Sequence, residues 1–147
     1  MATFSMLWSN HPAVNGDAAP CKDKNGARAY GNECAIRMSV LLEDSGVSTA
    51  TFKGACCWYG HGRAHILRAE ELANWLATQP GFGRPDKKKN VTSADYDGRQ
   101  GIAFFKDAFK NGVDHIDLWD GVTRKRMGLG DLSYFSLAKE LWFWDIP

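Results

Sequence analysis

The change from helical to strand-like spacing along the chain is the feature that most limits its fold. Apolar residues recur at helical intervals from Glu33 until Gly46, and again over residues 69–79. After Arg99 come short segments rich in β-branched and aromatic residues, namely 101–105, 113–119, a stretch around Tyr134 and Phe135, and 141–144. Helices followed by strands indicate an α+β fold. We therefore expect N-terminal helices packed on an antiparallel sheet.

The segments between these elements are expected to be mostly irregular. Residues 11–32 and 80–98 are rich in Gly, Pro, Asn and Asp, which favour loops, and the three lysines at 87–89 are expected at a solvated loop tip. Residues 47–52 contain several β-branched residues and are expected to form a short strand. A chain of 147 residues has the size of one ordinary domain, so we expect one over residues 1–147.

Charge and apolar content exclude two classes of partner. The formal net charge of +1 is too small for binding nucleic acid by phosphate neutralisation. No segment approaches the roughly 18 consecutive apolar residues that a membrane span needs. The first twenty residues contain no Lys or Arg and no long apolar block, so no secretory signal is expected. We therefore expect a protein made in the cytoplasm without a signal peptide.

Cys34 lies in the first turn of the first predicted helix, for which Asn32 is the expected N-cap. The helix dipole and the free N–H groups there favour the thiolate, which is the attacking form of cysteine. The backbone N–H of Cys34 can also donate to a developing oxyanion. Cys34 is therefore a candidate nucleophile. The alternative is a small buried residue with no chemical role.

His115 is the candidate general base. Strand alternation over residues 113–119 places Ile116 and Leu118 on one face, and His115, Asp117 and Trp119 on the other. A strand that presents a histidine toward a helix N-terminus carrying a cysteine gives the arrangement that thiol activation needs. The alternative is a surface histidine on a half-exposed strand.

The imidazole also needs a partner that fixes its tautomer and orientation, and Asp117, Asp120 and Asp131 are nearby candidates. Asp117 shares the face of His115, but two residues along one strand tend to point in parallel. A residue on the neighbouring strand reaches the ring more naturally, and Asp131 is expected to return there. We therefore expect Asp131 to orient His115, with Asp117 as the alternative.

The other cysteines allow two interpretations. Either Cys21 forms a disulfide with Cys56 or Cys57, which leaves Cys34 free, or all four are reduced thiols. A zinc site at Cys56, Cys57, His61 and His65 is an alternative, but adjacent cysteines are poor joint ligands and glycines flank His61. We expect no metal and no cofactor. The aromatic residues 58–59 are interpreted as core or as a wall of a substrate groove.

Three ordered motifs resemble the fourth family of type VI secretion amidase effectors. They are NECAIRMS at residues 32–39, which matches N-x-C-A-x-R-x-S, HIDLWDG at 115–121, which resembles that family's histidine strand, and DLSYF at 131–135. The closing aromatic residues 143–144 fit as well. The resemblance implies a papain-like α+β fold related to the NlpC-type cell-wall hydrolases. It also implies a catalytic triad of Cys34, His115 and Asp131, with Asp117 as the alternative third member because the spacing to Asp131 is longer than the family pattern.

The resemblance further implies an antibacterial effector that the type VI secretion apparatus delivers into the periplasm of a rival cell. There it would hydrolyse the amide between D-glutamate and meso-diaminopimelate in peptidoglycan stem peptides. It implies a cognate periplasmic immunity protein as a partner. Two other functions remain open at this point: another papain-like cell-wall hydrolase, such as a phage or housekeeping lysin, and a non-catalytic binding module.

Overall fold

Helices and a five-stranded sheet form the fold in the computed structural model, which describes residues 2–57, 64–108 and 113–147. The helices are α1 (Phe4–Ser9), α2 (Cys34–Asp44), α3 (Ala69–Leu76) and α4 (Tyr134–Leu137), with a 3-10 helix η1 (Ser93–Tyr96). The strands are β1 (Asp86–Lys88), β2 (Gln100–Lys106), β3 (His115–Asp120), β4 (Arg126–Met127) and β5 (Glu140–Asp145). This order confirms the predicted α+β fold.

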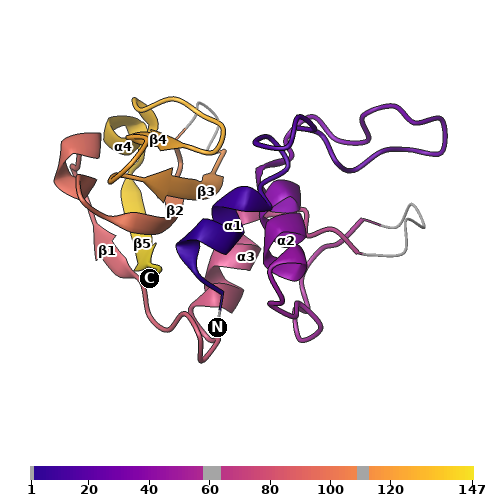
Figure 1. The fold of residues 1–147 in the computed structure, drawn as a ribbon, viewed down its shortest axis with the longest axis horizontal. Helices are drawn as coiled ribbons and strands as arrows, with labels where there is room; N and C mark the ends of the chain where they lie inside the picture. Colours follow the sequence, from indigo (N-terminus) through magenta and orange to yellow (C-terminus); the bar gives the residue numbers. More distant parts are fainter. Residues whose placement is uncertain (1, 58–63, 109–112) are drawn as a thin grey trace.

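The sheet is antiparallel throughout and has the strand order β1-β5-β2-β3-β4. In Figure 1, helices α1, α2 and α3 lie together beside the sheet, and the loop between α1 and α2 extends on the far side of α2. The two chain ends meet, since Phe4 N donates to Pro147 O at 2.7 Å. None of the described helices is long and apolar enough to cross a membrane.

Both faces of the sheet are buried. On one face, Ile116 and Leu118 of β3 join a core with residues of α1, α2 and α3. On the other face, Trp119 packs with Phe135 of α4 and Phe143 of β5. The predicted alternation of β3 is therefore confirmed. The face that carries His115 does not point to solvent, however, because α4 and its neighbours cover it.

Local signals explain where the helices begin and end. Gly46 follows the end of α2 and has a φ of 83°. Glycine adopts this left-handed conformation with the least steric strain, because it has no side chain. Helix α3 carries Glu70 and Glu71 in its first turn, which suits the positive end of the helix dipole, and buries Leu72 and Leu76. It ends earlier than residue 79, the predicted boundary.

Three of the segments named in the sequence predictions adopt a type of structure other than the expected one. Residues 47–52 form turns and not a strand, because Val47 N donates to Leu42 O at 2.8 Å and closes the end of α2. The stretch around Tyr134 and Phe135 is the short helix α4 and not a strand.

The third difference is the lysine-rich segment, which is not a loop tip. Lys87 and Lys88 belong to the edge strand β1, which pairs with β5. Lys87 Nζ lies 3.8 Å from the centre of the Trp142 ring. The Lys87 side chain therefore covers the Trp142 ring of β5 and keeps its charge at the surface.

Candidate active site

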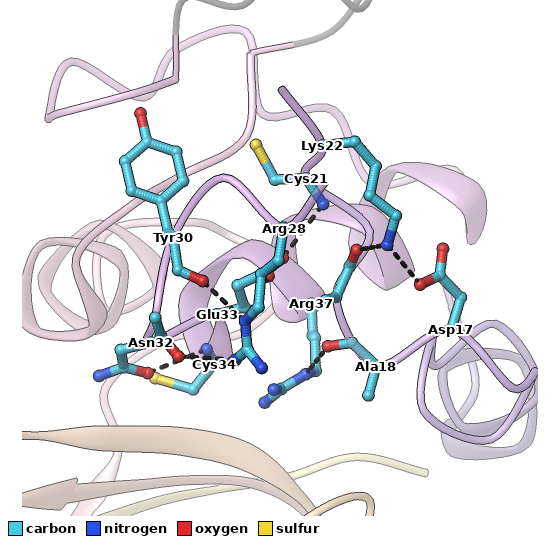
Figure 2. A network of polar contacts seen from close by, with 12 residues as sticks. Asp17, Ala18, Cys21, Lys22, Arg28, Tyr30, Asn32, Glu33, Cys34 and Arg37 are labelled. Atoms are coloured by element: carbon cyan, nitrogen blue, oxygen red, sulfur yellow. Dashed lines mark hydrogen bonds and ion pairs between the residues drawn. The ribbon is translucent and has the colours of Figure 1, made fainter. Parts of the chain in front are cut away.

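Cys34 is the first residue of α2, and the helix begins one residue later than predicted. Glu33 occupies the N-cap position, so the expectation that Asn32 is the N-cap is wrong. The Asn32 side chain nevertheless accepts a hydrogen bond through Oδ1 from Cys34 N at 3.2 Å (Figure 2). The backbone N–H that we expected to face an oxyanion is thus bonded to Asn32 in this structure.

Glu33 departs from an ordinary cap because its carboxylate turns into the protein. Its Oε1 accepts from Cys21 N at 3.1 Å, and its Oε2 lies 3.1 Å from Arg28 Nε (Figure 2). The Glu33 side chain is fully buried. These contacts fix the loop that leads into α2, and so they hold Cys34 in place.

His115 opens β3 and is buried, with 6% of its surface exposed. Its ring lies edge-on to Tyr134, with centroids 4.9 Å apart, and beside Phe105, with centroids 5.9 Å apart. The alternative of a surface histidine is therefore wrong. Aromatic residues from α4 and β2 restrict how the imidazole can rotate.

The structure brings Cys34 and His115 together where α2 meets β3. Burial by itself lowers the pKa of His115, but its interactions with the Asp117 and Cys34 side chains outweigh that effect and raise this pKa to about 9. The imidazole therefore carries its proton at neutral pH. A protonated imidazole next to a cysteine is the arrangement that favours a thiolate.

Asp117 supplies the carboxylate beside His115. His115 Nε2 lies 3.6 Å from Asp117 Oδ2, which also accepts from Leu129 N at 2.7 Å. Asp117 Oδ1 accepts from Leu118 N at 2.7 Å and from His11 Nε2 at 2.8 Å. Burial raises the pKa of Asp117, but the hydrogen bond with His11 and the ion pair with His115 prevail and hold it well below its usual range. Asp117 is thus a buried carboxylate anion.

Asp131, the expected orienting acid, has a different environment from Asp117. It is exposed, and its Oδ1 accepts a hydrogen bond from Ser133 N at 2.8 Å. Hydrogen bonds with Ser133 lower the pKa of Asp131. The expected return on a neighbouring strand does not occur, because the segment after Asp131 forms α4. The structure therefore brings Cys34, His115 and Asp117 together and leaves Asp131 at the surface.

His11 is the residue of this site that sequence reasoning missed. It is fully buried, and its Nδ1 accepts from Ala13 N at 3.1 Å. Since Nδ1 is an acceptor, Nε2 carries the hydrogen and donates to Asp117. His11 lies in a loop-rich segment with no periodic pattern, so no sequence signal pointed to it.

A groove of about 460 Å³ opens beside these residues. Its described lining consists of Gly31, Asn32, Glu33, Arg37, His115, Leu129, Gly130 and Tyr134. Arg37 brings a guanidinium to the groove and is held there by a 2.5 Å hydrogen bond from its Nε to Ala18 O (Figure 2). The aromatic residues 58–59, which we interpret as core or as a groove wall, lie outside the described residues, and so does His61 of the alternative zinc site.

The site resembles that of the papain-like class of hydrolases. It has a cysteine at a helix N-terminus, a histidine on the adjoining antiparallel sheet and a carboxylate beside that histidine. The comparison with known proteins specifies the family. The model of type VI secretion system (T6SS) amidase effector protein 4, Tae4, matches residues 30–144, and the chain belongs to this family. The resemblance of the three motifs is thereby confirmed.

Solved Tae4 structures share the whole fold. Tae4 of Salmonella Typhimurium, in its complex with the immunity protein Tai4, has a TM-score of 0.77 and 23% identity, with 100% of this chain and 99% of that chain covered. Tae4 of Enterobacter cloacae, also in complex with Tai4, has a TM-score of 0.75 and 21% identity, with 100% and 99% covered. Among curated proteins, none matches this sequence significantly.

Proposed function

We propose that this member of the amidase effector family is a cysteine amidase in which Cys34 is the nucleophile, His115 the acid–base residue and Asp117 the residue that orients His115. The observation that carries the proposal is the buried chain of contacts from Cys34 through His115 to Asp117 beside a groove. A cysteine without a chemical role does not need a protonated, oriented imidazole as its neighbour.

The ring orientation supports a separate role for each of the two imidazole nitrogens. Nε2 faces Asp117, so Nδ1 serves the sulfur of Cys34. The Cys34 thiolate attacks the carbonyl carbon of the amide, and the electron pair of the carbonyl moves to oxygen. His115 then gives its proton to the leaving amine, and water hydrolyses the resulting thioester with His115 acting as base.

The Cys34 N–H and the Asn32 side chain form the proposed oxyanion site. In this structure the Asn32 Oδ1 accepts from that N–H at 3.2 Å. A substrate oxyanion can replace Oδ1 as the acceptor, because both are negatively polarised oxygens. Rotation of the Asn32 side chain then leaves its NH₂ group at the mouth of the groove.

The proposed substrate is the peptidoglycan stem peptide, and the proposed cleavage lies between D-glutamate and meso-diaminopimelate. Stem peptides carry several carboxylates, and Arg37 offers the groove a guanidinium that suits one of them. We assign Arg37 to the α-carboxylate of the D-glutamate residue. The proposed place of action is the periplasm of the target bacterium, reached through the type VI apparatus.

The proposed partner is an immunity protein of the Tai4 kind. The Tae4 proteins of Salmonella Typhimurium and Enterobacter cloacae are found in complexes with Tai4. A periplasmic protein that covers the groove of this chain would protect the producing cell. We also propose that residues 1–147 act as one catalytic domain.

The experiment that tests the function is digestion of purified disaccharide tetrapeptide muropeptides, followed by mass spectrometry. The wild-type chain should release one product that ends in D-glutamate and one that begins with diaminopimelate. The Cys34→Ala variant should release neither. Products cut at another amide would point to a different cell-wall hydrolase. Binding without turnover by the wild-type chain would point to a non-catalytic module.

A further inference from the structure

A second group of cysteine and histidine side chains lies outside the set of residues that line the groove. Cys21, Cys57 and His65 are all buried, and their sulfur and nitrogen ligand atoms all lie within 4.8 Å of one another. Cys21 and Cys57 pack against Ile36 of α2. The proposed catalytic mechanism does not use this group.

The orientation of the cysteines separates Cys57 from its neighbour Cys56. Cys57 Sγ lies 3.4 Å from His65 Nδ1, and Cys57 also forms a side-chain hydrogen bond with Cys21. Cys56 Sγ instead donates to Gly54 O at 3.7 Å. Cys57 is therefore the neighbour of Cys21, and both sulfurs are reduced in this structure.

We propose that Cys21 and Cys57 are a latent disulfide pair, which stays reduced in the cytoplasm and closes in an oxidising compartment. We take this compartment to be the periplasm of the target bacterium, and that identification rests on the proposed function. The sulfurs must approach from at most 4.8 Å to roughly 2.0 Å, a distance that side-chain rotation can cover.

The chemistry balances with a small-molecule or protein disulfide as the oxidant. Cys57 passes its proton to His65 Nδ1 and attacks one sulfur of the oxidant, which releases one thiolate. Cys21 then attacks the Cys57 sulfur of this mixed disulfide and releases the second thiolate. One S–S bond forms and one breaks, and the two protons lost by the cysteines end on the two thiols released.

The cross-link would tie the loop before α2 to the segment around Cys57. Cys21 N already donates to Glu33 Oε1, and Glu33 directly precedes Cys34 (Figure 2). Figure 2 also shows the Cys21 sulfur pointing away from Cys34, so the disulfide would leave the nucleophile free. The bond would thus stabilise the loop that positions Cys34 once the protein has left the cell that made it.

A bound zinc ion is the competing use of the same three side chains. Among the described residues this group supplies three donors, whereas structural zinc sites almost always have four. Two adjacent sulfurs suffice for a disulfide. The observations therefore favour the disulfide, and zinc becomes an outcome of the test.

The test uses the full chain with Cys34→Ala, which removes the nucleophile and leaves three of the four cysteines. The reduced protein is incubated in a glutathione buffer poised at roughly −200 mV, alkylated under denaturing conditions and weighed by mass spectrometry. We expect one alkylated cysteine in place of three, and a linked peptide that contains Cys21 and Cys57. The oxidised form should melt about 10 °C higher than the reduced form.

Matched variants on the same background complete the test. Cys56→Ser should keep the cross-link and the higher melting temperature, whereas Cys57→Ser should lose both. Three alkylated cysteines after oxidation, or a link through Cys56, would overturn the proposal. So would one equivalent of tightly bound zinc that protects Cys21 and Cys57 until a chelator removes it. These readouts do not depend on amidase activity, so they fail or succeed separately from the proposed function.

Discussion

His11 donates a hydrogen bond of 2.8 Å from Nε2 to Oδ1 of Asp117, and the two residues are 106 positions apart in the chain. Both side chains are almost completely buried. The bond joins the loop after α1 to β3, the strand that carries His115. Because Asp117 Oδ2 faces His115, His11 fixes the carboxylate that the proposed mechanism needs.

Loss of the His11 hydrogen bond should impair turnover through Asp117. We expect His11→Ala to lower kcat about 10- to 100-fold with little change in KM, as for other residues that orient a catalytic group from behind. His11→Gln keeps an N–H donor and should recover part of the loss. Steady-state kinetics on a purified muropeptide measures both. An unchanged kcat in His11→Ala would remove His11 from the site.

Gly128 should tolerate no side chain, because it lies against the same pair. A Cβ atom there would come within 2.4 Å of His11 Nε2 and 2.8 Å of Asp117 Oδ1. We expect Gly128→Ala to lower the free energy of unfolding by about 1–3 kcal/mol and to reduce kcat. Gly31→Ala is the stability control, since a Cβ at Gly31 meets nothing within 4 Å. Equal denaturant midpoints for the two variants would contradict this explanation.

The proton on His115 predicts an alkaline limit to activity. Its raised pKa of about 9 means that the imidazolium is present below this pH and is lost as the pH rises through it. We therefore expect kcat/KM to fall above about pH 9, because the leaving amine then loses its acid. The imidazolium also stabilises the folded state. This stabilisation should be fully present below the unfolded pKa of about 6.5, and it should be lost as the pH rises through the folded pKa of about 9.

An NMR titration of His115 tests whether Asp117 causes the raised pKa of this residue. Asp117→Asn removes the anion that helps to keep the proton on the ring, so the midpoint should move to lower pH. Asp131→Asn should leave the midpoint unchanged, because that carboxylate is exposed and bonded to Ser133. A midpoint near that of a free histidine in the wild-type chain would refute the imidazolium assignment.

Arg37 should determine how tightly the substrate binds. A charge-assisted hydrogen bond to the D-glutamate carboxylate predicts that Arg37→Gln raises KM about 10- to 100-fold. A muropeptide with that carboxylate amidated provides the matched test. The wild-type chain should discriminate against it, and Arg37→Gln should not. If both proteins discriminate equally, the carboxylate is recognised elsewhere.

The sequence predicted the parts of the site that depend on local patterns. Cys34 follows from a helix start, and the orientation of His115 follows from alternation along β3, which the structure confirms. Strands β2 and β5 were recognisable because buried apolar and aromatic residues dominate them, and β3 was recognisable because its apolar residues alternate. Edge strand β1 was missed, because a strand with one open side can carry lysines in place of apolar residues.

The remaining parts of the site depend on contacts between distant segments. His11 contributes to the site only through its contact with Asp117, and the residues next to His11 in the sequence do not indicate that contact. Asp131 was expected as the orienting acid because side chains two residues apart on one strand, such as His115 and Asp117, tend to point in parallel. Asp117 instead turns toward His115, because Leu118 N, Leu129 N and His11 hold both of its oxygens.

The most direct test of the proposed site compares kcat for Asp117→Asn and Asp131→Asn on the same disaccharide tetrapeptide. The account predicts that Asp117→Asn lowers kcat about a hundredfold or more, because the buried carboxylate that orients His115 is lost. Asp131→Asn should remain within about twofold of wild type, as expected for an exposed side chain that is hydrogen-bonded to Ser133 N. A large loss in Asp131→Asn together with a nearly normal Asp117→Asn would contradict the account.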